Sequence, residues 1–217
     1  MASQLIYGKQ PVFEAERGRR RVHRVWRAPE TSVAELERLC GSPDHQGVVA
    51  EVDPYPYGDP GGLLKREGAL IVALDQVQDP RNLGAVCRSA EFAGAAGVVI
   101  PDRRAAEVTA VACKASAGAV EHLEVAHVRN LADWLGEAKD AGFWIWGADA
   151  EATQAPWDVD LTDKTVLVLG GEGKGIRPRV ASMCDDLIAL PSHGKVDSLN
   201  VSAAASALLF EAARQRV

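Results

Sequence analysis

Three segments of this 217-residue chain combine residue types that could take part in chemistry. The first is glycine-rich and reads Leu169-Gly170-Gly171-Glu172-Gly173-Lys174-Gly175. A phosphate-binding P-loop needs Ser or Thr after the lysine, where Gly175 stands, and the dinucleotide pattern GxGxxG is broken at Ile176. The glycines therefore predict a close approach of this backbone to a ligand or to another chain segment, with a tight turn as the simpler alternative.

The other two segments are polar and lie beside expected helices. The second runs from Asp79 to Ala90, where Asn82 could cap the following helix and Arg88 could lie on its surface. The third runs from Leu190 to Ser202 and leads into the last expected helix, so its Ser and Asn residues could serve as N-caps. Taken singly, both segments are compatible with purely structural roles.

A basic stretch near the N-terminus contrasts with the net charge of −6. The negative total argues against indiscriminate nucleic-acid binding, but a local patch can still bind RNA phosphates. A solvated charged face is the equal alternative. The stretch contains Arg17, Arg19, Arg20, Arg21, Arg24 and Arg27, with His23 and Trp26 between them.

Alternating strands and helices must position these segments. Apolar runs predict strands at 69–74, 97–100, 125–128, 143–146, 165–169 and 187–190, and helices are expected at 82–95, 107–116, 131–141 and 200–216. This alternation predicts an α/β domain with a mostly parallel sheet, whose ligands bind beyond the carboxyl ends of the strands. In the last helix one face should be apolar: Val201, Ala205, Leu208, Leu209 and Ala212.

A Pro- and Gly-rich stretch at 53–62 predicts a division into two domains, 1–62 and 63–217. In the first, a helix is expected at 35–39 and a strand at 47–52. A piece of about 60 residues is marginal for an independent core. We therefore expect it to lean on the rest of the chain or on a partner.

The composition argues against several classes of protein. No apolar run approaches the ~20 residues of a membrane span, and the first ten residues lack the pattern of a signal peptide. The cysteines lack CxxC spacing, so we expect no metal site, and we expect reduced thiols in a cytoplasmic protein. These are Cys40, Cys87, Cys113 and Cys184.

Together, and in this order, the three segments resemble the SpoU (TrmH-type) family of the SPOUT superfamily, most closely its rRNA guanosine-2′-O-methyltransferase subgroup. The family pattern NxGxxxR is matched by Asn82 to Arg88, GxEGxG by Gly170 to Gly175, and SLNVS by Ser198 to Ser202. The resemblance covers about residues 69–217. The piece 1–62 resembles the small RNA-binding domain of that subgroup in a shortened form.

The resemblance implies a fold, a cofactor and partners. The fold would be α/β, with a mostly parallel SPOUT-type sheet and a deep C-terminal trefoil knot, preceded by a small truncated α+β N-terminal domain. The cofactor would be S-adenosylmethionine and the substrate RNA. The protein would be a homodimer with its active site at the subunit interface, bound to neither membrane nor metal.

The resemblance also assigns roles by position. Catalytic positions fall on Arg88, Asn82, Glu172, Ser198 and Asn200, and cofactor-binding positions on Gly170, Gly171, Leu190 and Leu199. The candidate RNA-binding residues are the arginines of the N-terminal stretch, namely Arg17, Arg19, Arg20, Arg21 and Arg24.

The expected reaction is methylation of a ribose 2′-hydroxyl in ribosomal RNA. A guanidinium is effectively never deprotonated, so we expect Arg88 to hold the neighbouring phosphate and stabilise the developing alkoxide rather than act as a base. Transfer RNA is the first alternative substrate, although small tRNA enzymes commonly lack an N-terminal appendage. A non-catalytic RNA-binding or ribosome-assembly factor on the same fold is the second alternative, which the intact motif residues disfavour.

Overall fold

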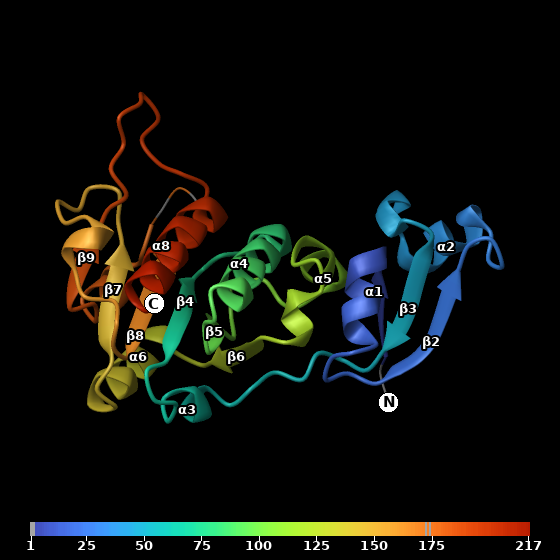
Figure 1. Ribbon diagram of the computed structural model, residues 1–217, viewed down its shortest axis with the longest axis horizontal. Coiled ribbons are helices and arrows are strands. Elements are labelled where there is room, and N and C mark those ends of the chain that lie inside the picture. The colour runs from blue at the N-terminus through green and yellow to red at the C-terminus, as the bar shows by residue number, and fades with distance from the viewer. Residues whose placement is uncertain (1–2, 172, 174) are drawn as a thin grey trace.

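The computed structural model describes residues 3–171, 173 and 175–217, and its strands form two sheets (Figure 1). The N-terminal sheet is antiparallel and has the order β1-β3-β2, from β1 (Gln4–Tyr7), β2 (Val22–Arg27) and β3 (Val48–Val52). The second sheet is parallel and has the order β6-β5-β4-β8-β7-β9. Its strands are β4 (Leu70–Asp75), β5 (Gly97–Pro101), β6 (Glu124–Val128), β7 (Trp144–Ala148), β8 (Thr165–Gly170) and β9 (Asp186–Ile188). The predicted α/β class with a mostly parallel sheet is confirmed.

Helices cover both faces of the parallel sheet. Helices α4, α5 and α8 pack on one face, while α3, α6 and α7 pack on the other. The helices are α1 (Lys9–Ala15), α2 (Val33–Cys40), α3 (Pro60–Leu63), α4 (Pro80–Phe92), α5 (Ala110–Ala115), α6 (Leu131–Asp140), α7 (Pro178–Ala181) and α8 (Val201–Gln215). The described residues also form the short 3-10 helices η1 (Pro43–His45), η2 (Ala119–Glu121) and η3 (Pro156–Asp158).

Strand β4 lies in the middle of this arrangement. Every one of its residues is buried, as expected of an apolar run in a parallel sheet with both faces covered. Its side chains alternate, so that Val72 packs in the cluster with α4 and α8, and Ile71 packs in the cluster with α6 and α7. The carboxyl end of β4 therefore opens at the centre of the sheet edge.

Helix α8 has the predicted apolar face. Its buried residues are the five that the helical spacing selects: Val201, Ala205, Leu208, Leu209 and Ala212. They pack against the face that α4 also covers, and Ser206 in α8 lies 2.7 Å from Ser89 in α4, oxygen to oxygen. The two helices therefore form one packed pair on this side of the sheet.

The part of the chain before residue 54, here called the N-terminal lobe, has more structure than the sequence predicts. Helix α2 and strand β3 were expected, while β1, α1 and β2 were not. Side chains of β1, α1 and β3 belong to the same apolar cluster as those of the parallel sheet, for example Ile6, Val12 and Val48. The expectation that this piece leans on the rest of the chain is therefore confirmed.

Polar contacts also fasten the lobe to the rest of the molecule. The side chain of Arg20 is buried, and its Nε donates to Glu121 Oε2 over 3.0 Å while Nη1 donates to Gln4 Oε1 over 2.7 Å. The buried Tyr55 hydroxyl lies 2.8 Å from Leu123 O and accepts from Arg19 Nη2 over 3.0 Å. Figure 1 shows α1 between the lobe's sheet and α5.

These contacts correct one prediction. The sequence places Arg20 among the RNA-binding arginines, but its guanidinium is buried and ion-paired with Glu121. A side chain held in this way cannot reach a phosphate outside the protein, so we remove Arg20 from the candidate RNA-binding set. The division at residue 62 stays a prediction, since α3 (Pro60–Leu63) spans it.

Membrane-spanning helices need both length and a continuous apolar surface. Within the described residues, no helix is long and apolar enough to cross a membrane.

Candidate active site

The predicted chemistry gathers at the carboxyl ends of β4 and β8. Asp75 ends β4 and is in register with Gly170, which ends β8. The backbone N–H of Gly171 then donates to Asp75 O over 2.8 Å. The glycine-rich segment thus lies at the edge of the sheet where ligands of parallel α/β proteins bind.

The glycines of this segment permit close backbone approaches. A Cβ on Gly170 would collide with the backbone of Gly175, and a Cβ on Gly171 would collide with the carbonyl oxygen of Gln76. Gly171 and Gly175 also form a β-bridge. The prediction that this backbone closely approaches another chain segment is confirmed. Glu172, predicted to be catalytic, lies outside the described residues.

A polar pocket of about 410 Å³ opens beside this loop. Its volume falls within the range of small-molecule sites. Among the residues predicted from the sequence, Asn82 and Gly171 line it. The described residues that line it are Gln76, Val77, Gln78, Asp79, Asn82, Arg104, Gly171 and Gly175.

Two of the predicted residues meet across 118 positions of sequence. Asn200 Nδ2 donates to Asn82 Oδ1 over 3.1 Å, which joins the start of α8 to α4. Asn200 also caps α8, because its Oδ1 accepts from the Ser202 N–H over 2.8 Å. The alternative of Asn82 as a helix cap is wrong: Asp79 caps α4 through the Arg81 N–H, and Asn82 lies inside the helix with a buried side chain.

Arg88 lies further along α4 and points to solvent. It is absent from the lining of the pocket, and it forms no hydrogen bond or ion pair with the residues that the structure describes. Phe92 follows it by one helical turn and is 77% exposed. The Phe92 ring lies 5.8 Å, centroid to centroid, from the half-exposed ring of Phe210 in α8. Arg88 therefore borders an exposed aromatic pair rather than the pocket of its own chain.

The remaining predicted residues lie on the segment between β9 and α8. Ser198 and Leu199 are exposed on this segment, which extends away from the sheet in Figure 1. Leu190 is partly buried and packs against the core just after β9. None of these three is among the residues that line the described pocket.

An ion pair beneath the loop was not predicted from the sequence. Asp75 has a fully buried carboxylate, and the Arg177 backbone N–H and Nε each donate to it over 2.8 Å. This pair fixes the end of β4 to the chain that follows the glycines. An aspartate at the end of an otherwise apolar run was the one signal of it, because a buried carboxylate requires a partner.

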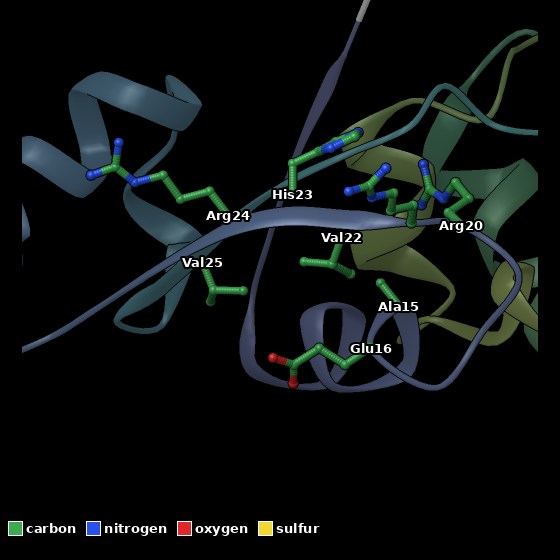
Figure 2. Close-up of a pocket in the computed structure, with 8 residues that line it drawn as sticks. Ala15, Glu16, Arg20, Val22, His23, Arg24 and Val25 are labelled. Carbon is green, nitrogen blue, oxygen red and sulfur yellow. The ribbon is translucent and has the colours of Figure 1, made fainter.

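The arginine-rich stretch forms a second concave surface, in the N-terminal lobe. Strand β2 is an edge strand, and residues 20–25 line a cavity of about 510 Å³ together with Ala15 and Glu16 (Figure 2). The Arg24 guanidinium lies 4.9 Å from the centroid of the Trp26 ring, and that of Arg17 lies 5.1 Å from the Phe13 ring. Both are cation–π distances.

An open parallel sheet with a polar pocket and a glycine-rich turn at the ends of its central strands is the arrangement of a cofactor-dependent α/β enzyme. The chain belongs to the SpoU rRNA methylase family, whose profile matches residues 69–210. A relative from Bacillus subtilis (strain 168), YacO, whose name assigns it to the TrmH family of tRNA/rRNA methyltransferases, is 39% identical over 97% of this chain and 95% of its own.

Two further comparisons agree. A tRNA/rRNA methyltransferase of Mycobacterium avium (strain 104), described as uncharacterized, is 44% identical over 86% of this chain, which spans 62% of that relative. The crystal structure of the SpoU methyltransferase AviRb from Streptomyces viridochromogenes, in complex with the cofactor AdoMet, has a TM-score of 0.83 and 27% identity, covering 99% of this chain and 90% of its own. S-adenosylmethionine is the cofactor of this family.

Proposed function

We propose that this protein methylates a ribose 2′-hydroxyl of RNA with S-adenosylmethionine, and that the RNA is ribosomal. The observation that carries the proposal is the polar pocket beside Gly171, at the sheet edge where the family motifs meet. Membership of the SpoU rRNA methylase family supports RNA methylation. The names of the relatives, tRNA/rRNA methyltransferases, cover both classes of substrate.

The composition of the pocket favours ribose over base as the target. Enzymes that modify a base stack it between aromatic or apolar side chains. The described residues that line this pocket include no aromatic side chain and are mostly amides, charged groups and glycines. Such a lining suits a ribose and its phosphates, which present hydroxyl and anionic oxygens.

The cofactor would lie against the glycine-rich turn. Gly170 and Gly171 leave no room for side chains, so backbone N–H and C=O groups would hold it, together with Leu190 and Leu199. Bound S-adenosylmethionine would supply an activated methyl group. The chain's own residues would position the hydroxyl: the bonded pair of Asn82 and Asn200 is suited to orient the ribose, beside Ser198.

Arg88 would act from a second copy of the chain. It is exposed and does not line the pocket of its own chain, yet it shares a helix face with Phe92. Exposed aromatic side chains are typical of protein interfaces. We propose a homodimer that covers Phe92 and Phe210 and carries Arg88 into the partner's site, where its guanidinium would stabilise the developing alkoxide. Replacing Phe92 with Ser should yield monomers in sedimentation and lower methyl transfer.

We also propose the trefoil knot. The sheet order supports it, because the chain leaves β8, crosses β7 and forms β9 on the far side. The segment after β7 then encloses the chain, since Gln154 is bridged to Ile188 and its carbonyl accepts from the Ala189 N–H over 2.9 Å. A knotted chain pulled by its ends should stop short of its full contour length.

The RNA would enter from the N-terminal lobe. Arg17, Arg19, Arg21 and Arg24 remain candidate phosphate contacts, and this lobe favours ribosomal RNA over tRNA as the substrate. The buried thiols of Cys87 and Cys113, both free, are consistent with the cytoplasm, which we propose as the site of action.

The first experiment measures transfer of labelled methyl to ribosomal RNA and, separately, to bulk tRNA, with Arg88→Ala as the control. Label in an alkali-resistant dinucleotide of rRNA, absent with the variant, would establish the proposed function. Label in tRNA alone would support the methyltransferase activity and contradict ribosomal RNA as the substrate. Label in neither RNA, with no binding of S-adenosylmethionine, would favour a non-catalytic factor.

A further inference from the structure

The pocket of the proposed site has a basic side chain that belongs to none of the three family motifs. Arg104 follows β5 and lines the same pocket as Asn82 and Gly171. It is exposed, and it forms no hydrogen bond or ion pair with the part of the chain that the structure describes. Arg177, which also lies near this edge of the sheet, is by contrast paired with Asp75. Arg104 is therefore available to bind a ligand.

The sheet order fixes which wall of the pocket Arg104 occupies. Strands β5 and β8 flank β4 on opposite sides. Arg104 follows the first and Gly171 the second, so two strand spacings, roughly 9.5 Å, separate the strand ends from which they emerge. The glycine-rich turn is the proposed place of the cofactor, which leaves the Arg104 wall for the RNA.

The backbone at this wall is held in an unusual conformation. Arg104 has φ of 58° and Gln76, which lines the same pocket, has φ of 62°. Residues other than glycine seldom adopt this left-handed region, and such strain gathers at binding sites where the surrounding structure enforces it. Here the Ala106 N–H donates to Val77 O over 2.8 Å and ties the two loops together. The chain thus keeps an arginine where a glycine would be less strained.

We propose that Arg104 binds a backbone phosphate of the RNA next to the target ribose, and so positions the 2′-hydroxyl. The inference rests on the proposed function. A guanidinium binds phosphate through two parallel hydrogen bonds, which fixes orientation as well as distance. The carboxylate of the cofactor has a similar chemistry, but the cofactor is assigned to the opposite wall. The RNA phosphate is therefore the anion we assign to Arg104.

The test compares Arg104→Gly with Arg103→Gly. Glycine at position 104 removes the guanidinium and relieves the left-handed strain, so the variant should unfold at the same temperature as the wild type or higher. We expect its KM for RNA to rise about tenfold or more, the effect of losing a charged hydrogen bond. The Kd for S-adenosylmethionine should not change. The logarithm of the RNA association constant falls as the logarithm of the salt concentration rises. The magnitude of this slope should decrease by about 0.7, which corresponds to the loss of one phosphate contact.

Arg103 is the matched control, because it is an exposed neighbour of like charge outside the pocket lining. Its glycine variant should keep the wild-type KM. An equal rise in the KM for RNA in both variants would mean that Arg104 contributes only as part of the general positive charge of the surface. A weakened Kd for S-adenosylmethionine with an unchanged KM for RNA would assign Arg104 to the cofactor's carboxylate. Either result overturns the proposal, as does a wild-type KM in Arg104→Gly.

Failure of the proposed function would be visible separately. A wild-type protein that transfers no methyl to RNA contradicts that function whatever Arg104 does. RNA binding measured without turnover, by filter retention of labelled rRNA fragments, then still decides whether Arg104→Gly alone weakens the complex and lowers its salt dependence. An Arg104→Lys variant should recover part of the affinity, since a lysine keeps the charge but not the planar fork.

Discussion

At Arg88, the contribution of the positive charge to catalysis can be separated from that of the planar guanidinium. If its planar guanidinium stabilises the developing alkoxide, Arg88→Ala should lower kcat by about 10²–10³, as the loss of one such donor does elsewhere. Arg88→Lys should recover only part of this loss, because an ammonium keeps the charge and loses the fork. Single-turnover methyl transfer measures both values. Near-normal turnover in the lysine variant would contradict a requirement for the planar group.

Gly170 is the residue where the close approach of two backbones is most demanding. A Cβ there would collide with Gly175 and with the Ile176 nitrogen, so Gly170→Ala should destabilise the fold by about 1–3 kcal/mol and abolish binding of S-adenosylmethionine. Thermal unfolding and calorimetry measure the two effects.

Gly173→Ala is the control for Gly170→Ala. Gly173 has positive φ, which is unfavourable for alanine. No described atom lies within 4 Å of the position that a Cβ would take, so alanine would cause backbone strain there but no collision. Its cost should be about 1 kcal/mol, typical of a left-handed alanine. Equal losses in the two variants would show that crowding at Gly170 does not matter.

At the scale of elements, the sequence predicts those helices and strands whose pattern of apolar residues matches the pattern of burial in the structure. Strand β4 is buried at every position and α8 buries the five residues that its spacing selects. Strand β2 was missed because its side chains are partly or fully exposed and a bulge between Val22 and Arg24 breaks the two-residue period. A continuous apolar run or a one-sided apolar spacing therefore predicts an element, whereas an exposed strand with a bulge provides neither signal.

The site shows the same division between local and distant information. The motif residues Asn82 and Asn200 were found, and their direct bond was not, because it joins positions 118 apart. The cap of α4 was assigned to Asn82 instead of Asp79, since both residue types favour that position and local preference cannot choose between them. The pair of the buried Asp75 and the half-exposed Arg177 depends on the turn of the glycine-rich segment, which a linear pattern does not contain.

The attachment of α1 should depend on pH. Glu14 in α1 forms hydrogen bonds with His122, over 2.8 Å, and with Gln10, over 2.7 Å, and these bonds hold the pKa of its carboxyl below the ordinary value of 4.5. A lowered acid pKa stabilises the folded state above 4.5, and this contribution is lost as the pH falls through the lowered pKa. Wild type should therefore lose more thermal stability than Glu14→Gln between about pH 6 and the acid range, as calorimetry can measure. Parallel curves for the two proteins would contradict this role.

At the scale of the whole molecule, a buried ion pair joins the lobe to η2, beside the apolar cluster that the lobe shares with the parallel sheet. Arg20 and Glu121 are both buried, and removing one partner leaves the other charge without compensation. Glu121→Gln should therefore cost about 3–5 kcal/mol in urea unfolding. The exposed pair of Arg27 and Glu16 is the control, and Glu16→Gln should cost less than about 1 kcal/mol.

We expect the same pair to influence how the lobe would present RNA to the pocket. Arg20→Met combined with Glu121→Leu exchanges the buried charges for apolar groups, a change that is often neutral for stability. If the pair serves only stability, this double variant should restore both the wild-type unfolding midpoint and the wild-type KM for rRNA. If the pair also fixes the angle of the β2 arginines, stability should return while KM stays raised. We expect the second result, because Arg20 also donates to Gln4 Oε1, and Gln4 Nε2 donates to Val108 O over 2.9 Å, so the network holds the lobe to the rest of the chain at a second point. A wild-type KM in the stable double variant would contradict that expectation. The apolar contacts of α1 and β1 would then be sufficient to set the orientation of the lobe.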